Sequence, residues 1–202
     1  EQTQLLIKKL SSIYIVTIAP ILLIMIVLSN DIVQLFFSKS FIEAHKIIPY
    51  ISLGAFFYGL AQYINKAFEL TEKTKYLFYL LLISSLLTIT SNLILIPKYG
   101  YMGAAFSVLI GYLSYTLFSY IFSFKNFKWL IPWETIWKVF VSLVSSFVVF
   151  NFINFKISIL SLSLFINCFL VIIIYLISIL LLREQTIMNF VNKNYNWAFK
   201  KK

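Results

Sequence analysis

The chain reads NLILIPKYGYMGAA from Asn92 to Ala105, and this stretch decides how the polypeptide is organised. A proline such as Pro97 can end an apolar helix, and Gly100 can adopt the positive φ angle of a tight turn. The small residues from Gly103 onward allow the next helix to approach its neighbour closely. The stretch therefore predicts a tight hairpin between two membrane-spanning helices.

The composition of the whole chain indicates a membrane protein. Of its 202 residues, 61% are hydrophobic and 12% are charged, which is more apolar surface than a water-soluble core of this size can hide. A helix crosses the hydrocarbon of a bilayer with about 20 apolar residues. We expect an all-α membrane protein, a bundle of six transmembrane helices over residues 1–183. The expected spans are 10–30, 46–67, 76–97, 101–123, 134–153 and 159–182.

The positive charges indicate a membrane orientation rather than nucleic-acid binding. The formal net charge is +10, but the basic residues cluster beside alternate span ends and form no continuous stripe. Because cytoplasmic loops are enriched in lysine and arginine, we expect both ends of the chain in the cytoplasm. The expected cytoplasmic set is Lys8, Lys9, Lys66, Lys73, Lys75, Lys125, Lys128, Lys138, Arg183, Lys193, Lys200, Lys201 and Lys202. The expected outside set is Lys39, Lys46, Lys98 and Lys156.

Two further segments are expected at the cytoplasmic interface. Trp129, Trp133 and Trp137 lie around the start of the fifth span, and tryptophan is enriched at membrane interfaces. Beyond Arg183, the tail 184–202 carries apolar residues at helical spacing and ends in three lysines. This pattern predicts an amphipathic helix that lies on an anionic leaflet.

The second expected span carries the richest polar set. The set is Tyr58, Gln62, Asn65 and Lys66. Its members recur at spacings of three and four, so one helix face becomes polar toward the cytoplasmic end. A polar face inside a bilayer must look at the protein bundle or at water, which makes these residues candidates for lining a substrate cavity. The competing interpretation for Lys66 is an ion pair with Glu69, with its ammonium extended to the cytoplasmic surface.

A stripe of hydrogen-bonding residues follows on the third expected span, at positions i, i+4 and i+8. It consists of Ser84, Thr88 and Asn92. The stripe either lines the same cavity or joins neighbouring helices through hydrogen bonds. The fourth expected span repeats this spacing with Gly103, Ser107 and Gly111, a small-residue pattern that predicts close packing against the third.

The chain carries no recognisable catalytic or metal-binding pattern. Its seven acidic residues all lie at span ends or in loops, whereas proton relays and intramembrane hydrolases need an ionisable group at depth. One histidine, His45, and one cysteine, Cys168, do not make a metal site by themselves. No P-loop, HExxH or GxSxG sequence occurs. We expect no enzyme activity, no catalytic residue, no metal and no cofactor.

These segments resemble the C-terminal part of bacterial polysaccharide or O-antigen repeat-unit flippases, in the multidrug/oligosaccharidyl-lipid/polysaccharide exporter superfamily. The clearest piece is Asn92–Ala105, which is similar to the family's Asn, Leu-Ile-Pro, aromatic-Gly, Gly-Ala-Ala pattern. Supporting pieces are Leu35–Ala44 and the Lys73–Lys75 turn, and the similarity runs through most of residues 10–123. The chain departs from the family pattern at Ser38, Glu72, Ser107 and Val108.

The resemblance implies a fold of 12 to 14 helices in two lobes around a central cavity, of which this chain would supply roughly the last six. It implies alternating-access translocation of undecaprenyl-pyrophosphate-linked oligosaccharide units across the bacterial inner membrane, for the synthesis of cell-surface polysaccharide such as the O-antigen of lipopolysaccharide. The implied partners are the lipid-linked oligosaccharide, bilayer lipids and a missing N-terminal lobe of the same protein.

Two other functions fit parts of the pattern. A multidrug or cation exporter of the same superfamily would be favoured by an acidic residue at mid-span in the preceding half, together with a small apolar cavity. A membrane polymerase or ligase acting on lipid-linked sugars usually carries a large outside loop with arginine and histidine, whereas the outside connections here are short. A purely structural membrane subunit is a third possibility.

Overall fold

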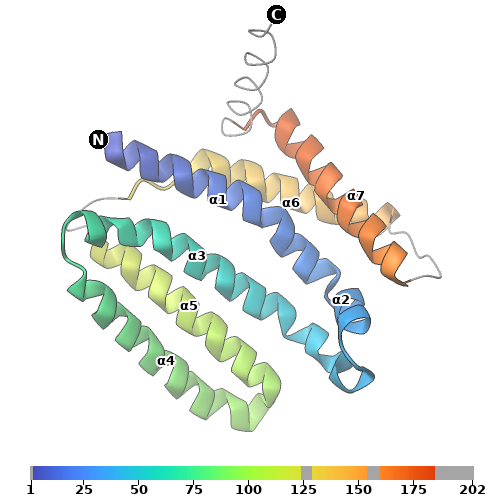
Figure 1. The fold of residues 1–202 in the computed structure, drawn as a ribbon, viewed down its shortest axis with the longest axis horizontal. Coiled ribbons are helices and arrows are strands. Elements are labelled where there is room, and N and C mark those ends of the chain that lie inside the picture. The colour runs from blue at the N-terminus through green and yellow to red at the C-terminus, as the bar shows by residue number, and fades with distance from the viewer. Residues whose placement is uncertain (1, 124–128, 154–159, 185–202) are drawn as a thin grey trace, which may run out of the picture.

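A computed structural model describes residues 2–123, 129–153 and 160–184, so that nearly all of the tail 184–202 lies outside the described residues. Every regular element within these ranges is a helix, which confirms the all-α fold class (Figure 1). The elements are α1 Gln2–Val27, α2 Ser29–Phe36, the 3₁₀ helix η1 Lys39–Lys46, α3 Ile48–Leu70, α4 Lys75–Tyr99, α5 Tyr101–Ser123, α6 Trp133–Ile153 and α7 Leu160–Leu181.

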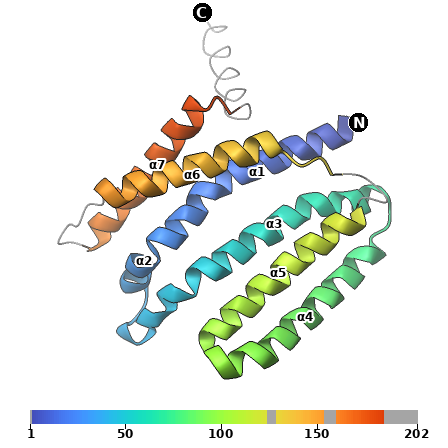
Figure 2. The same ribbon diagram turned by 180° about the vertical axis from the view of Figure 1, so that it is seen from behind.

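The long helices run back and forth, and several of them pack against helices that do not follow them directly in the chain. α5 packs between α3 and α4, and α3 packs against α1 on its other side. α6 and α7 pack against each other and against α1, as the view from behind shows (Figure 2). The spatial order is therefore α4, α5, α3 and α1, followed by the α6–α7 pair.

The expected spans agree with the helices to within a few residues, except at the start of the chain. Five helices are long and apolar enough to cross a membrane: α1, α4, α5, α6 and α7. The sixth candidate is η1 together with α3, a pair bent by 53°. The first span, expected from residue 10, begins earlier as α1, because Gln2–Lys9 continue the same helix. The structure thus contains five or six candidate spans.

Two of the apolar clusters of the described residues lie in different halves of the bundle. Between α1, α6 and α7, the side chains of Val16, Val139 and Ile179 are buried against one another. Between α3, α4 and α5, Phe68 packs with buried side chains that include Leu80. Because α1 belongs to the first cluster and α3 to the second, the α1–α3 contact joins the two halves.

The α4–α5 hairpin forms as predicted, with one correction. Pro97 does not end α4, which continues to Tyr99, because a proline in a last turn removes only a hydrogen bond near the helix end. The helix ends at Gly100, whose φ of +56° suits glycine. A Cβ at Gly103 would clash with the carbonyl group of Leu95. The predicted close packing of the two helices is therefore confirmed.

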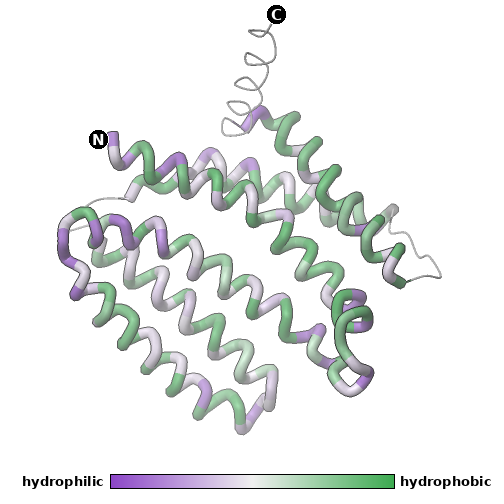
Figure 3. The backbone as a smooth tube through the Cα atoms, viewed as in Figure 1, coloured by the Kyte–Doolittle hydropathy of each residue, from purple (hydrophilic) through white to green (hydrophobic). Residues whose placement is uncertain are grey.

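The most hydrophilic segments gather at the two ends of the bundle (Figure 3). We name the end with η1, the α4–α5 turn and the start of α7 the η1 end. Lys39, Lys46 and Lys98 lie in elements at this end. The described members of the expected cytoplasmic set lie toward the opposite end of the bundle: Lys8 and Lys9 early in α1, Lys66 late in α3, Lys73 in the α3–α4 turn, Lys75 at the start of α4, Lys138 early in α6 and Arg183 just after α7. The sequence-based division of charges between the two ends therefore matches the fold.

The tryptophans behave differently from one another. Trp133 and Trp137 at the start of α6 are exposed, as expected of interfacial anchors. Trp129 is instead buried in a cluster with Ile7 of α1 and Ile64 of α3. The indole of Trp129 therefore packs inside the bundle, unlike those of the other two members of the expected interfacial belt.

Candidate functional site

One face of α3 stays uncovered by the described helices, and three of the predicted site residues lie on it. Tyr58 is 40% exposed, and Gln62 and Lys66 are exposed. Along the helix these three residues follow one another at intervals of four, so that they form a single stripe. We name Tyr58, Gln62 and Lys66 the α3 stripe.

The cation of the stripe already has a partner. The Lys66 ammonium lies 2.5 Å from Glu69 Oε2, and both side chains are about half exposed. The ion pair expected as the competing interpretation of Lys66 is therefore present. An exposed pair of this kind contributes little to stability, so Lys66 remains free to exchange the glutamate for another anion.

Asn65 belongs to a different face of α3. It is 2% exposed, and its Nδ2 donates a hydrogen bond of 2.9 Å to the hydroxyl of Tyr115 on α5. Tyr115 also contacts Tyr58, with ring centroids 5.8 Å apart. Tyr112 on α5 contacts Tyr58 as well, with ring centroids 5.1 Å apart. The stripe therefore begins at an aromatic cluster shared with α5, while Asn65 is buried in the interface.

The polar residues predicted on α4, which are Ser84, Thr88 and Asn92, face α5 rather than an open cavity. Ser84 is buried and its hydroxyl donates to the carbonyl oxygen of Leu80. Thr88 donates to the carbonyl oxygen of Ser84, and its Oγ1 sits where a side chain at Gly111 would otherwise lie. Asn92 is half-buried, with its Oδ1 enclosed. This environment favours a role in helix packing for the α4 residues.

The two predicted halves of the site do not meet. α5 separates α3 from α4 along most of their length (Figures 1 and 2). A cavity lined by both the α3 stripe and the α4 residues therefore does not form within the described chain. A pocket of about 250 Å³ lies between α1 and α3, and none of the α3 stripe residues lines it.

Sequence reasoning missed a polar seam between α1, α6 and α7. The Tyr175 hydroxyl on α7 donates to the carbonyl oxygen of Val16 on α1, at 2.9 Å. Ser145 on α6 donates to the hydroxyl of Ser178 on α7, at 3.0 Å. The sequence signal for this seam is the recurrence of serine at a four-residue interval along α6. The signal is ambiguous, because serines whose hydroxyls bond only to the backbone of their own helix produce the same pattern.

A buried acid was also missed. Glu184 is 2% exposed and accepts a hydrogen bond of 2.9 Å from the Thr135 hydroxyl. Lys138 donates to the carbonyl oxygen of Arg183 next to it, at 3.2 Å. These contacts tie the end of α7 to the start of α6. Their position at the bundle end, rather than at mid-membrane, gives them a structural role.

The described residues contain no group of three or more histidine, cysteine, aspartate or glutamate side chains placed to hold a metal ion. Comparisons with protein families, with curated proteins and with solved structures give no match for this chain. The α3 stripe is therefore assessed from its own geometry and chemistry.

Proposed function

We propose that this chain is one lobe of a bacterial inner-membrane flippase for undecaprenyl-pyrophosphate-linked oligosaccharides. The observation that supports it best is the α3 stripe, a row of hydroxyl, amide and ammonium groups that no described helix covers. Polar groups at membrane depth face protein or water. A second lobe of the same protein, placed across the stripe, would turn it into one wall of an aqueous cavity.

The sequence resemblance at Asn92–Ala105 supports the same proposal, and the hairpin at this position has the close packing that its glycines predict. We assign the η1 end to the outside of the cell, because most basic residues lie at the opposite end. In this orientation Lys66 is at the cytoplasmic mouth of the cavity. A substrate made in the cytoplasm would meet it first.

The chemistry of the stripe suits a charged, hydroxyl-rich headgroup. A pyrophosphate that leaves water needs compensation of its charge, and the Lys66 ammonium supplies it when it exchanges Glu69 for the phosphate. Sugar hydroxyls need hydrogen-bonding partners, which Gln62 and Tyr58 offer further along the helix. Transport then requires only that two lobes rock about the site. No covalent bond is made or broken, so the proposed protein is not an enzyme.

The test is a translocation assay on the full-length protein in proteoliposomes loaded with undecaprenyl-pyrophosphate-linked oligosaccharide. The measured quantity is the rate at which the sugar becomes accessible to an enzyme added outside. We expect Gln62→Leu and Lys66→Gln each to lower this rate about tenfold. Each substitution removes one polar or charged contact to the substrate, and the loss of about 1.4 kcal/mol corresponds to a tenfold change in rate. Thr90→Val, on the exposed face of α4, is the matched control and should leave the rate unchanged. A rate equal to that of protein-free vesicles contradicts the proposal.

A further inference from the structure

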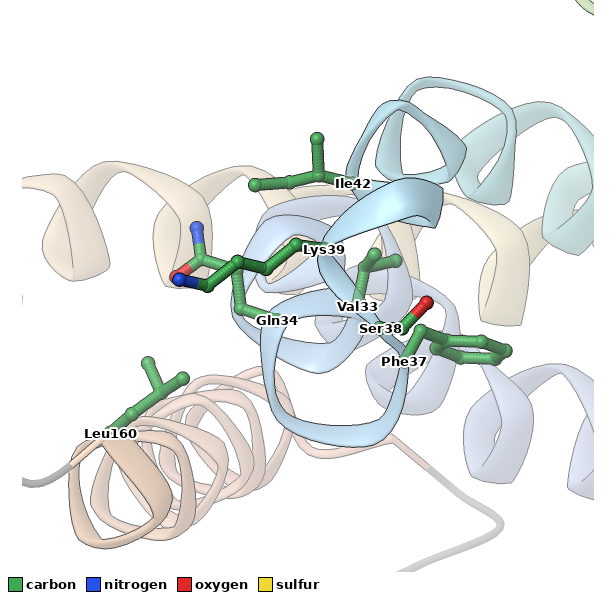
Figure 4. Close-up of a pocket in the computed structure, with 7 residues that line it drawn as sticks. All are labelled: Val33, Gln34, Phe37, Ser38, Lys39, Ile42 and Leu160. Atoms are coloured by element: carbon green, nitrogen blue, oxygen red, sulfur yellow. The ribbon is translucent and has the colours of Figure 1, made fainter.

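A cavity lies away from the α3 stripe, at the η1 end. It has a volume of about 340 Å³ and lies between the α2–η1 connection and the first residue of α7. Val33, Ile42 and Leu160 give it apolar walls, and Gln34 and Lys39 give it polar atoms (Figure 4). We name it the η1 pocket.

Two nitrogen-bearing side chains, those of Gln34 and Lys39, line this pocket. In Figure 4 both side chains extend toward the side on which Leu160 is drawn. Phe37 and Ser38 point the other way. One amide donor and one cation thus lie beside an apolar surface, an arrangement that suits an anion attached to a hydrocarbon chain.

The charge at this position is uncompensated within the described residues. Lys39 forms no ion pair there, whereas Lys46, Lys66 and Lys138 each pair with a glutamate. No acidic residue lines the pocket. The nearest acids in the chain are Asp31, three residues before Gln34 and half-buried, and Glu43, four residues after Lys39 and paired with Lys46. The pocket therefore attracts anions.

Its position in the fold specifies the kind of anion. Phe36, Phe37 and Phe41 lie in or beside the segment that lines the pocket and are more than half exposed. Exposed apolar side chains such as phenylalanine insert at the boundary between lipid headgroups and acyl chains. α1 and α7, the candidate spans on either side, place the pocket at the end of the apolar zone. This is the depth at which phospholipid phosphates lie.

We propose that the η1 pocket binds the phosphodiester headgroup of a membrane glycerophospholipid, preferentially an anionic one. The Lys39 ammonium and the Gln34 amide contact the phosphate, and the first carbons of an acyl chain lie between Ile42 and Leu160. The site depends on the chain spanning a membrane but not on the transport function proposed above. A failure of the translocation assay would leave it untouched.

The experiment is native mass spectrometry of the purified full-length protein, delipidated and then supplied with phosphatidylglycerol. The measured quantity is the fraction of protein that carries one lipid at a series of lipid concentrations. We expect Lys39→Gln to weaken binding about tenfold, since it removes one charge-assisted contact. Gln34→Glu should weaken it further, because the new carboxylate repels the phosphate and pairs with Lys39. Lys39→Arg should retain binding.

The matched control is Lys98→Gln, which removes an exposed cation at the same end of the bundle but outside the pocket. An equal loss in Lys98→Gln would overturn the proposal in favour of general attraction to a basic surface. Unchanged binding in both Lys39→Gln and Gln34→Glu would overturn it as well. Displacement of the lipid by inorganic phosphate alone at millimolar concentration would assign the pocket to a free anion. The unfolding temperature of each variant without lipid shows that the fold is retained.

Discussion

Asn65 of α3 and Tyr115 of α5, separated by 50 residues in the chain, share a hydrogen bond of 2.9 Å between the amide nitrogen and the phenol oxygen. Both residues are buried, so the bond lies in the interface that joins the two helices. The Asn65 Oδ1 atom has no hydrogen-bond partner among the described residues. The amide is therefore satisfied on one side only.

This half-satisfied contact predicts unequal effects of two substitutions. Tyr115→Phe removes the partner of a buried amide and should lower the free energy of unfolding by about 1 kcal/mol, the scale of interhelical hydrogen bonds in membranes. Asn65→Leu also leaves the Tyr115 hydroxyl without this partner, but it removes an amide whose Oδ1 is already unsatisfied, so its loss should be smaller. Thermal unfolding in detergent measures both. A larger loss for Asn65→Leu than for Tyr115→Phe would show that the amide has a second essential partner.

The glycines of α5 predict a rescue experiment. A Cβ at Gly111 would meet the Thr88 hydroxyl, while the Thr88 Cβ is 3.3 Å away. Gly111→Ala should therefore cost about 1–3 kcal/mol through overpacking, and adding Thr88→Ala should recover much of the loss. Gly103→Ala would meet the backbone of Leu95, and no side-chain truncation can relieve that clash.

The readout for these glycine variants is the unfolding temperature, treated as a double-mutant cycle for Gly111 and Thr88. Strictly additive effects of the two substitutions would mean that α4 and α5 do not touch at this point. Gly103→Ala combined with Thr88→Ala serves as the control, since Thr88 does not contact the Gly103 position.

A cluster at the η1 end predicts a dependence on pH. Hydrogen bonds from the Lys46 ammonium and from the Tyr101 hydroxyl, the latter at 3.1 Å, lower the pKa of the Glu43 carboxyl below its ordinary value of 4.5. Because the folded-state pKa is lowered, the stabilisation is complete above the ordinary pKa and is lost as the pH falls through the lowered one. The cluster thus links η1 to α5 at neutral pH.

We expect Glu43→Gln to unfold at a lower temperature than the unchanged protein at pH 7, with a difference that vanishes as the pH is taken well below 4.5. The effect should be small, because the carboxyl is exposed. Glu72→Gln, which changes an exposed acid at the opposite end, is the control. A difference that persists at low pH would show that the substitution acts through packing.

The sequence predicted the helices well because apolar runs and turn residues are local properties. Pro97 is an example of what the local sequence does not determine. The effect of a proline on a helix depends on how many helical turns follow it, and here α4 ends at Gly100, only three residues later. Trp129 is a second example. Whether a tryptophan beside a span faces the membrane interface or is buried in the bundle depends on the side chains that pack on it, and these are distant in sequence.

The candidate site was harder to predict than the fold. Residues at a spacing of four share a helix face, but the spacing does not tell which face meets a neighbour. Gln62 and Asn65 lie three positions apart, yet one is exposed and the other is buried against α5. The insertion of α5 between α3 and α4 separates two polar groups that the sequence treated as one site. Only tertiary packing carries that information.

The last prediction separates the α3 stripe from the buried interface by chemical labelling. With Cys168→Ser as background, we expect Gln62→Cys in the full-length protein to react with a membrane-impermeant thiol reagent, because position 62 is exposed and faces water in the proposed cavity. Asn65→Cys and Thr88→Cys should be protected, since α5 covers both positions. Ile83→Cys, exposed on α4 and apolar in its surroundings, is the control for a lipid-facing position and should also be protected. Reaction at position 62 that stops when lipid-linked oligosaccharide is added would place the substrate against the stripe. Protection at position 62 under all conditions would mean that lipid or a tightly packed helix covers this face, and the cavity assignment of Gln62 would be wrong.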